Sequence, residues 1–149
     1  VLFDDWTADS PTQIVTTLID EVAEYVPGQF FRRELPCLLQ LLREHQLRPD
    51  LIIVDGFVHL DGAGRRGLGM ELFDALDGRI PVVGVAKSAF GDLPDAFAVR
   101  RGESQRPLFV TAVGIDLEQA KRDIHRMAGP YRLPQLLKRV DQACRQWDL

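Results

Sequence analysis

The stretch RPDLIIVDG, residues 48–56, decides the fold of this chain, because its apolar run ends abruptly in Asp55 and a glycine. A second apolar run, IPVVGVAK, occupies residues 80–87. Between them GLGMELFDALDG, residues 67–78, has the pattern of a short helix ended by a glycine. Near-continuous apolar strands are typical of sheets covered on both faces. The sequence therefore predicts a strand, helix and strand unit whose two strands are buried and parallel.

Further strands and helices are expected around this unit. The expected strands are 1–6, 12–19 and 106–114, and the expected helices run from Phe30 or Phe31 to Gln46, over 116–128 with Asp116 as N-cap, and over 133–147. The fold class is therefore α/β, with a mixed sheet flanked by helices on both faces. We expect the first strands to be antiparallel and the later ones parallel.

Length and composition bound the kind of protein. With 149 residues and 46% hydrophobic content, residues 1–149 are expected to form one domain. A net charge of -4 gives no overall positive field, so nucleic acid would need a local basic patch. Without a membrane-spanning run or a signal segment, the chain is expected to be cytoplasmic and to have no membrane partner. Cys37 and Cys144 are expected to be reduced core cysteines.

The start of the chain suggests that a preceding segment exists. The chain begins with Val1 instead of methionine, and VLFDDW starts as a strand without a preceding turn or cap. We therefore expect the natural N-terminus to lie upstream of Val1.

Two strand ends and one helix start form the candidate site. Ligands of parallel α/β sheets bind beyond the carboxyl ends of the strands, where Asp55 and Lys87 are expected. Glu34 is expected at or just before the start of its helix, with Pro36 in the first turn, and can reach the same edge. Carboxylate oxygens suit Mg²⁺, which would activate water and stabilise charge on a phosphoryl group.

Each of these residues also has an ordinary structural interpretation. Asp55 can be a turn former or an N-cap, and Glu34 can complement the helix dipole. Lys87 can be a strand-end lysine whose ammonium group lies in solvent. Residue spacing alone therefore names a candidate site without naming a reaction.

Other residues point toward nucleic acid. Tyr25 precedes the rigid Pro27-Gly28 turn, which would present its ring to a base; the alternative is a ring packed on the core. The glycine-rich loop at 61–69 is a weak nucleotide fingerprint. It would still contribute arginines to a nucleic-acid backbone, namely Arg65 and Arg66. His59, four residues after Asp55, is the histidine placed nearest the candidate site.

Four segments together resemble endonuclease V, a family of metal-dependent nucleases with a ribonuclease-H-like fold that cleave nucleic acid near deaminated bases, above all inosine. The similar segments are YVPGQFFRRELPCLL (25–39), RPDLIIVDG (48–56), IPVVGVAKSAF (80–90) and GPYRLPQLLKRVD (129–141). They follow one another in the family's order. The resemblance implies that fold, and a hydrolysis one phosphodiester beyond the deaminated base on its 3′ side.

The resemblance also implies roles for residues. Glu34 and Asp55 would be catalytic carboxylates that bind Mg²⁺ or Mn²⁺, and Lys87 would be a catalytic contact to the scissile region. The wedge segment, residues 25–28, would help to extrude the modified base, since a pocket reads a base only after it leaves the stack. Gly56 would let the backbone turn sharply and leave room for an ion and a phosphate.

The chain departs from the family pattern at several places. Phe57 stands where the family has a histidine, Val113 where a second histidine is expected, and Glu24 where the wedge has its first proline. The family's first strand, which carries another catalytic aspartate, has no counterpart, and Asp4 and Asp5 are not assigned that role. Fewer carboxylates and histidines would weaken metal binding and proton transfer.

Three hypotheses of function follow. The first is a metal-dependent endonuclease acting on deaminated DNA or RNA. The second is a binding module for modified nucleic acid that has lost catalysis. The third is another metal-dependent phosphoesterase on the same fold.

Overall fold

The computed structural model describes residues 1–29 and 31–146. Its elements are α1 (Phe31–Glu44), β1 (Ile52–Asp55), α2 (Leu68–Ala75), β2 (Val82–Ala86), the short 3₁₀ helix η1 (Asp95–Phe97), β3 (Ala98–Val99), β4 (Leu108–Val113), α3 (Leu117–Arg126) and α4 (Gln135–Arg145). Phe30 and residue 147, which the expected helices included, lie outside the described residues. The short strand β3 was not expected from the sequence.

The four strands form one mixed sheet in the order β1-β2-β4-β3. β1 is parallel to β2, with Asp55 opposite Val85, which confirms the predicted strand, helix and strand unit. β4 is antiparallel to both β2 and β3. The prediction that antiparallel strands come first is therefore wrong. The loop between β3 and β4 makes them a hairpin, and hairpin neighbours are antiparallel.

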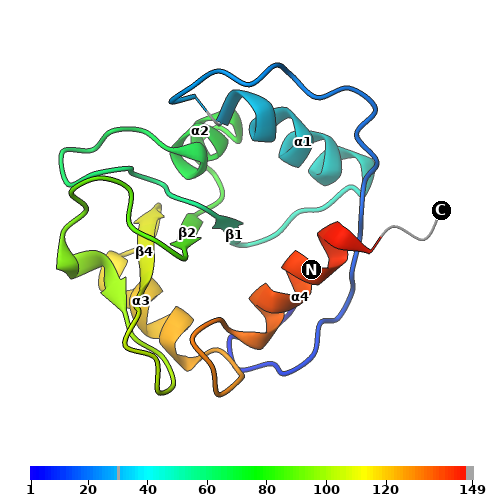
Figure 1. Ribbon diagram of the computed structural model, residues 1–149. Helices are drawn as coiled ribbons and strands as arrows, with labels where there is room; N and C mark the ends of the chain where they lie inside the picture. Colours follow the sequence, from blue (N-terminus) through cyan, green and yellow to red (C-terminus); the bar gives the residue numbers. More distant parts are fainter. Residues whose placement is uncertain (30, 147–149) are drawn as a thin grey trace.

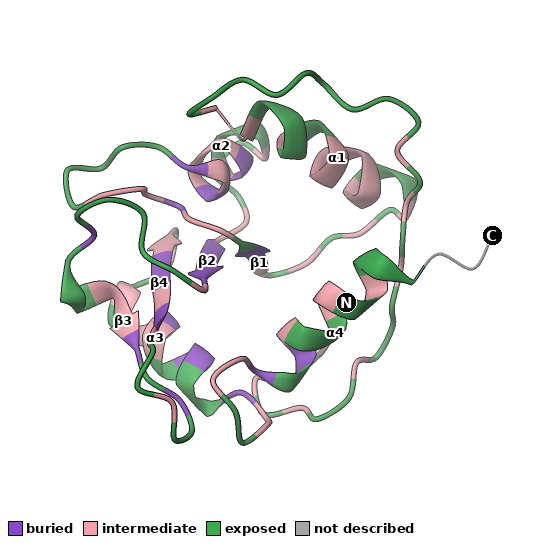
Figure 2. Cartoon of the chain, in the orientation of Figure 1, coloured by how far each residue is buried: buried purple, intermediate pink, exposed green. Residues whose placement is uncertain are grey.

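Helices cover both faces of the sheet, which confirms the predicted fold class (Figure 1). On one face, apolar side chains of α1 and α2 pack with Val54 and Val82. On the other face, α3 and α4 pack with Val83 and Val85. The neighbouring β2 residues alternate between the two clusters, as the side chains of a strand must. Figure 2 shows that the buried positions gather on β2, β4 and the inward sides of α2, α3 and α4.

The N-terminal residues do not form the strands expected at 1–6 and 12–19. Only an isolated bridge joins Leu2 to Gln13 in this part of the described chain. Residues 14–20 run past α1, whose Gln40 side chain donates to the Leu18 carbonyl at 3.5 Å. His45 follows the helix, and its Nε2 lies 2.9 Å from the carbonyl oxygen of Thr16. High β-propensity therefore does not produce a strand here, because side chains of a helix contact this backbone where a strand would need a neighbouring strand.

Three local expectations also need correction. β1 is an edge strand in which Val54 is the buried residue, and its outer side has no neighbouring strand in the described sheet. Pro36 lies inside α1 instead of in its first turn, and Glu34 lies within that turn instead of at the helix start. Cys144 is exposed and Cys37 half-buried, so neither is a core residue, although both are free thiols.

Other local expectations are confirmed. Asp116 caps α3 by accepting a hydrogen bond from the Gln119 amide at 3.0 Å. The Gly78 amide donates to the Phe73 carbonyl at 2.9 Å and closes the end of α2. No helix in the described part of the chain is both long and apolar enough to cross a bilayer.

Candidate active site at the carboxyl edge of the parallel strands

Asp55, Lys87 and Glu34 come together at the carboxyl edge of β1 and β2. Asp55 is the last residue of β1, and Lys87 follows β2 directly. The Lys87 Nζ lies 3.7 Å from Asp55 Oδ2. Glu34 lies in the first turn of α1. Partial desolvation, and then the negative charge of Asp55, raise the pKa of the Glu34 carboxyl above its ordinary value. The two carboxylates are therefore close enough to influence each other.

A fourth residue of this edge, Asp141, was missed by the sequence reasoning. The Lys87 Nζ donates a hydrogen bond of 2.7 Å to Asp141 Oδ2 from α4. This bond, together with the charge of Asp55, raises the pKa of the Lys87 ammonium group. Asp141 ends the fourth segment that resembles the family, but no local motif marks it. Its place depends on how α4 crosses the sheet.

The backbone of Lys87 is fixed by a second residue from the same C-terminal segment. One guanidinium nitrogen of Arg132 donates to the Lys87 carbonyl at 2.9 Å and to the Pro107 carbonyl at 3.3 Å. Arg132 thus joins the end of β2 to the start of β4. Lys87 is held at its backbone by Arg132 and at its ammonium group by Asp141.

Three glycines enclose the turn that follows Asp55. A Cβ added at Gly84 would lie 2.6 Å from the Gly56 carbonyl oxygen, and one at Gly67 would lie 2.5 Å from the Phe57 carbonyl oxygen. A Cβ at Gly69 would lie 2.6 Å from a methyl group of Val58. Gly56 itself has φ of 141°, a value that favours glycine. The turn is therefore packed against backbone on several sides.

A buried hydrogen bond also fixes this turn. The Val58 amide donates to the Thr111 Oγ1 of β4 at 2.8 Å. Thr111 is fully buried, so this hydrogen bond between its hydroxyl and the turn lies in the core. The position of Asp55 thus depends on contacts that cross the sheet.

The wedge segment lies beside the loop at 61–69. Gly28 has φ of 76°, and a Cβ placed there would lie 3.7 Å from the Arg65 guanidinium. The Arg65 guanidinium in turn lies 5.8 Å from the centre of the Phe90 ring. Tyr25 is 54% exposed, so its ring is not packed into the core. The structure thus places Gly28 and Arg65, two of the residues expected to contact nucleic acid, side by side.

Two other candidates are placed differently. The Arg66 guanidinium pairs with Glu71 at 2.9 Å and also with Asp74, both on α2. Its charge is therefore already balanced by two carboxylates. His59 forms an isolated bridge with Arg66, and its buried Nδ1 has no hydrogen-bond partner among the described residues. A role for Arg66 or His59 in binding nucleic acid stays a prediction.

The departures from the family pattern also have definite places. Val113 pairs with Val82 at the start of β2, about 16 Å along that strand from Lys87. The expectation that a valine at this position weakens metal binding stays a prediction. Phe57 is half-buried in the turn directly after Asp55.

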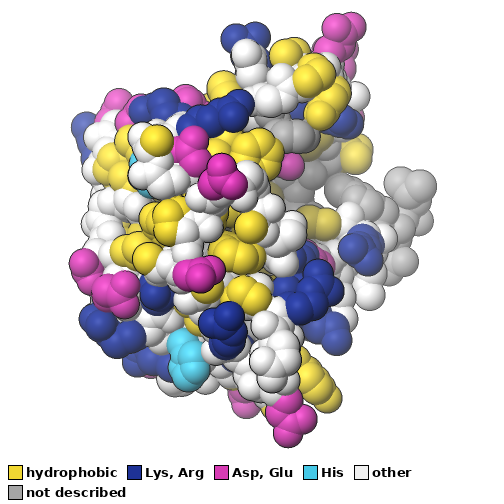
Figure 3. All heavy atoms as spheres, turned by 60° about the vertical axis from the view of Figure 1, so that its left-hand side comes forward, with side chains coloured by type: hydrophobic (Ala, Val, Ile, Leu, Met, Phe, Trp, Pro, Cys, Tyr) yellow, Lys and Arg dark blue, Asp and Glu magenta, His cyan; other side chains and the backbone are white. Residues whose placement is uncertain are grey.

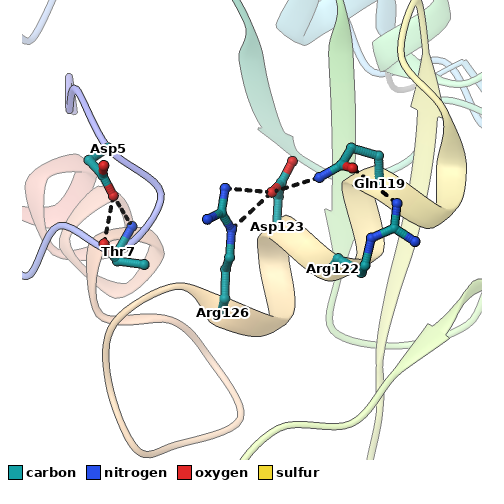
Figure 4. Close-up of polar contacts among 6 residues, drawn as sticks. All are labelled: Asp5, Thr7, Gln119, Arg122, Asp123 and Arg126. Carbon is teal, nitrogen blue, oxygen red and sulfur yellow. Dashed lines mark hydrogen bonds and ion pairs between the residues drawn. The ribbon is translucent and has the colours of Figure 1, made fainter.

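Asp5 belongs to a separate set of polar contacts (Figure 4). Its carboxylate accepts hydrogen bonds from the Thr7 amide at 2.7 Å and the Thr7 hydroxyl at 2.6 Å. On the neighbouring α3, the buried Asp123 binds Arg126 and Gln119. Asp5 therefore closes a turn with Thr7.

The fit of a divalent metal ion can be judged from the donor groups. No cluster of three His, Cys, Asp or Glu side chains suited to one ion occurs in residues 1–29 and 31–146. Glu34 and Asp55 nevertheless supply two carboxylates at one edge. Mg²⁺ commonly takes one or two carboxylates and completes its shell with water and substrate phosphate oxygens. The residues present fit such an ion.

The surface charge does not suggest a broad nucleic-acid face on the side that Figure 3 displays. Lys and Arg side chains alternate there with Asp and Glu side chains. The net charge of -4 agrees with this mixture. Attraction for a phosphate backbone would therefore have to come from local groups such as Lys87.

A mixed sheet with two carboxylates and a lysine at the carboxyl edge defines an α/β protein whose site has the donor groups of a metal-dependent phosphoesterase. Comparison with known proteins then gives the family. The sequence model described as Endonuclease V matches residues 5–105, and the chain belongs to the endonuclease V family.

Individual relatives agree with this assignment. Endonuclease V of Nocardia farcinica is 29% identical, over 81% of this chain and 61% of the relative. Endonuclease V of Rhodospirillum centenum is 33% identical, over 80% of this chain and 57% of the relative. The crystal structure of endonuclease V from Streptomyces avermitilis has a TM-score of 0.64 and 31% identity, covering 82% of this chain and 61% of that one. The chain thus spans about three fifths of the length of these relatives.

Proposed function

We propose that this chain is a metal-dependent endonuclease that hydrolyses a phosphodiester 3′ to a deaminated base, inosine above all, in DNA or RNA. The observation that carries the proposal is the meeting of Glu34, Asp55 and Lys87 at one edge of the sheet. Membership of the endonuclease V family supports it. Residues 1–149 would act as one domain in this reaction.

The carboxylates would hold the ion. Glu34 and Asp55 would bind Mg²⁺ or Mn²⁺, and Asp141 would hold the Lys87 ammonium group in place through its hydrogen bond. When bound, such an ion supplies activation of water and neutralisation of phosphate charge. The raised pKa of Glu34 makes its binding to a cation sensitive to acid, because a protonated carboxyl is a poor ligand.

Lys87 would act through its charge. The hydrogen bond from its ammonium group to Asp141 raises its pKa, so it stays protonated at neutral pH. A protonated lysine cannot be a general base. It can instead stabilise the negative charge that grows on a phosphoryl group or on its leaving oxygen. Arg132, which binds the Lys87 carbonyl, would keep that charge in place.

The deaminated base would be held near the wedge segment and Arg65. The wedge segment, residues 25–28, lies beside Arg65, whose guanidinium lies over the Phe90 ring. An exposed tyrosine and an arginine on an aromatic ring are groups that stack with bases. In this proposal Tyr25 fills the space that the extruded base leaves.

Cleavage assays test the proposal. Inosine-containing single and double strands of DNA and RNA would be incubated with the chain in Mg²⁺ and in Mn²⁺. We expect cleavage of at least one substrate, reduced about 100-fold or more in Asp55→Asn and Glu34→Gln. Glu118→Gln, which changes an exposed carboxylate of α3, should cleave like the parent chain. Absence of cleavage with every substrate, or full activity in Asp55→Asn, would refute the proposal.

A second candidate function is a binding module for modified nucleic acid without catalysis. It is favoured by the lack of a three-ligand cluster in the described part of the chain and by Phe57 in the turn after Asp55. It predicts that Asp55→Ala and Glu34→Ala bind inosine-containing strands as well as the parent chain does. Equal affinity for inosine-containing and unmodified strands would exclude it.

A further inference from the structure

A surface cavity of about 450 Å³ lies on α4 and the segment that precedes it. Its lining residues are Tyr131, Leu133, Lys138, Asp141, Gln142 and Arg145. The volume falls in the range of sites for small organic ligands. Of these residues, Asp141 also binds Lys87 of the candidate active site.

Asp141 joins the cavity to the candidate active site. Its carboxylate contacts the Lys87 ammonium group, which in turn lies 3.7 Å from Asp55 Oδ2. A group in the cavity is therefore separated from the carboxyl edge by one side chain. The negative charge of Asp141 is balanced by Lys87. The cavity is left with the positive charges of Lys138 and Arg145.

The cations lie on one face of α4. Lys138, Asp141, Gln142 and Arg145 are spaced by three, one and three residues, which puts them along one side of a helix. Lys138 and Arg145 are exposed. Two lysine or arginine side chains about two turns apart can both contact the backbone of one strand of nucleic acid.

Tyr131 presents its ring from a fixed backbone. The side chain is 73% exposed, so packing in the core does not explain an aromatic residue at this position. Its carbonyl accepts a hydrogen bond of 2.6 Å from the guanidinium of Arg101, which is 4% exposed. The same guanidinium binds four further carbonyls, those of His125, Met127, Gly129 and Arg132.

We propose that this cavity binds one unpaired nucleotide that flanks the scissile phosphodiester in a single strand. The base stacks on Tyr131, and the adjoining phosphate groups contact Lys138 and Arg145. This inference rests on the proposed function, because the scissile bond is placed at the carboxyl edge. A paired base is stacked within its duplex, so its face is not available to Tyr131.

The test measures binding without cleavage. A short fluorescein-labelled oligothymidine, which lacks inosine, is titrated with the full chain in EDTA and followed by anisotropy. Tyr131→Ala should bind about 5- to 160-fold more weakly, because stacking on an aromatic ring contributes about 1–3 kcal/mol per base. Tyr131→Phe, which keeps the ring, should bind within about twofold of the parent chain.

The cations are tested by the salt dependence. Lys138→Gln and Arg145→Gln should each weaken binding and reduce the slope of log K against log salt by about 0.7, as expected for one phosphate contact on a single strand. Arg79→Gln is the charge-matched control, since Arg79 precedes β2 at the opposite edge of the sheet. It should bind like the parent chain. The Tyr131 variants should unfold at the parent's temperature, because the side chain is exposed.

The outcomes separate this inference from the proposed function. Nucleotide binding in the cavity is refuted when the parent chain does not bind the oligothymidine, or when Tyr131→Ala binds it as tightly as the parent. It is also refuted when Arg79→Gln weakens binding as much as Arg145→Gln. Inosine cleavage by the parent in those cases would leave the proposed function intact. Conversely, a Tyr131 effect on binding without any cleavage would support the cavity and refute the nuclease.

Discussion

Replacing Gly84 by alanine should displace the turn that carries Asp55. The new methyl carbon would lie 2.6 Å from the Gly56 carbonyl oxygen, 2.7 Å from Thr111 Oγ1 and 2.9 Å from the Val58 nitrogen. Two of these three atoms belong to the backbone, and the third sits on a short, buried side chain. None can move aside by a simple rotamer change. The chain must therefore separate β2 from the turn.

The cost can be estimated from these contacts. Overpacking in a core costs about 1–3 kcal/mol. Separation also breaks the hydrogen bond from the Val58 amide to Thr111 Oγ1, and an unpaired buried amide costs about 1–3 kcal/mol. We therefore expect Gly84→Ala to lower the free energy of unfolding by about 3–5 kcal/mol. The melting temperature should fall by about 6–20 °C for a chain of this size.

Urea denaturation of the parent chain, Gly84→Ala, Thr111→Ala and the double variant measures this effect. Thr111→Ala removes the hydroxyl contact and the hydrogen bond together, so Gly84→Ala should cost less in that background than in the parent chain. The coupling energy should be about 1 kcal/mol or more. A loss below about 1 kcal/mol for Gly84→Ala, or strict additivity of the two changes, would show that the turn is not packed as described.

Three further predictions concern single contacts. Arg101→Met should lower the free energy of unfolding by about 3–5 kcal/mol, because five backbone carbonyls lose a charged donor. Arg101→Lys should lower it by less, and equal losses for the two variants in urea titrations would contradict this. Asp55→Asn should lower the pKa of Glu34 in NMR titrations, since the charge of Asp55 helps to raise it. The raised pKa makes stability fall as pH rises from the ordinary glutamate pKa through the higher pKa of the folded state, and this fall should shrink in the variant. An unchanged Glu34 titration would show that the two carboxylates do not interact. Asp116→Ala should cost about 1 kcal/mol in thermal unfolding through loss of the cap on Gln119, and a loss no larger than that of Glu118→Gln would argue against the cap.

Local patterns were enough to predict the centre of the fold. The apolar runs that end in Asp55 and Lys87 gave the parallel pair and the edge where the two side chains meet. The direction of β4 was not predictable from its own composition, because it depends on the hairpin with β3, a strand of two residues. Residues 12–19 have the composition of a strand, but contacts with Gln40 of α1 and with His45 after it decide their conformation.

The site was predictable only in part, for a similar reason. Glu34, Asp55 and Lys87 stand in segments with a recognisable pattern. Asp141 lies on an amphipathic helix where an acidic residue suggests nothing but a solvated face. Its bond to Lys87 arises from the packing of α4 across the sheet. Tertiary contacts of this kind leave no periodicity in the sequence.

The extended path of the N-terminal residues has a consequence for the dynamics of the proposed nuclease. Side chains of His45 and Gln40 bind carbonyls at Thr16 and Leu18, and residues 21–28 beyond them are exposed. Regions held by few buried contacts open locally at much lower free energy than core strands. Amide hydrogen exchange should therefore be fast around Tyr25 and slow around Val83 in the core of the sheet. The part that would probe the nucleic acid can thus fluctuate without loosening the strand that carries Asp55.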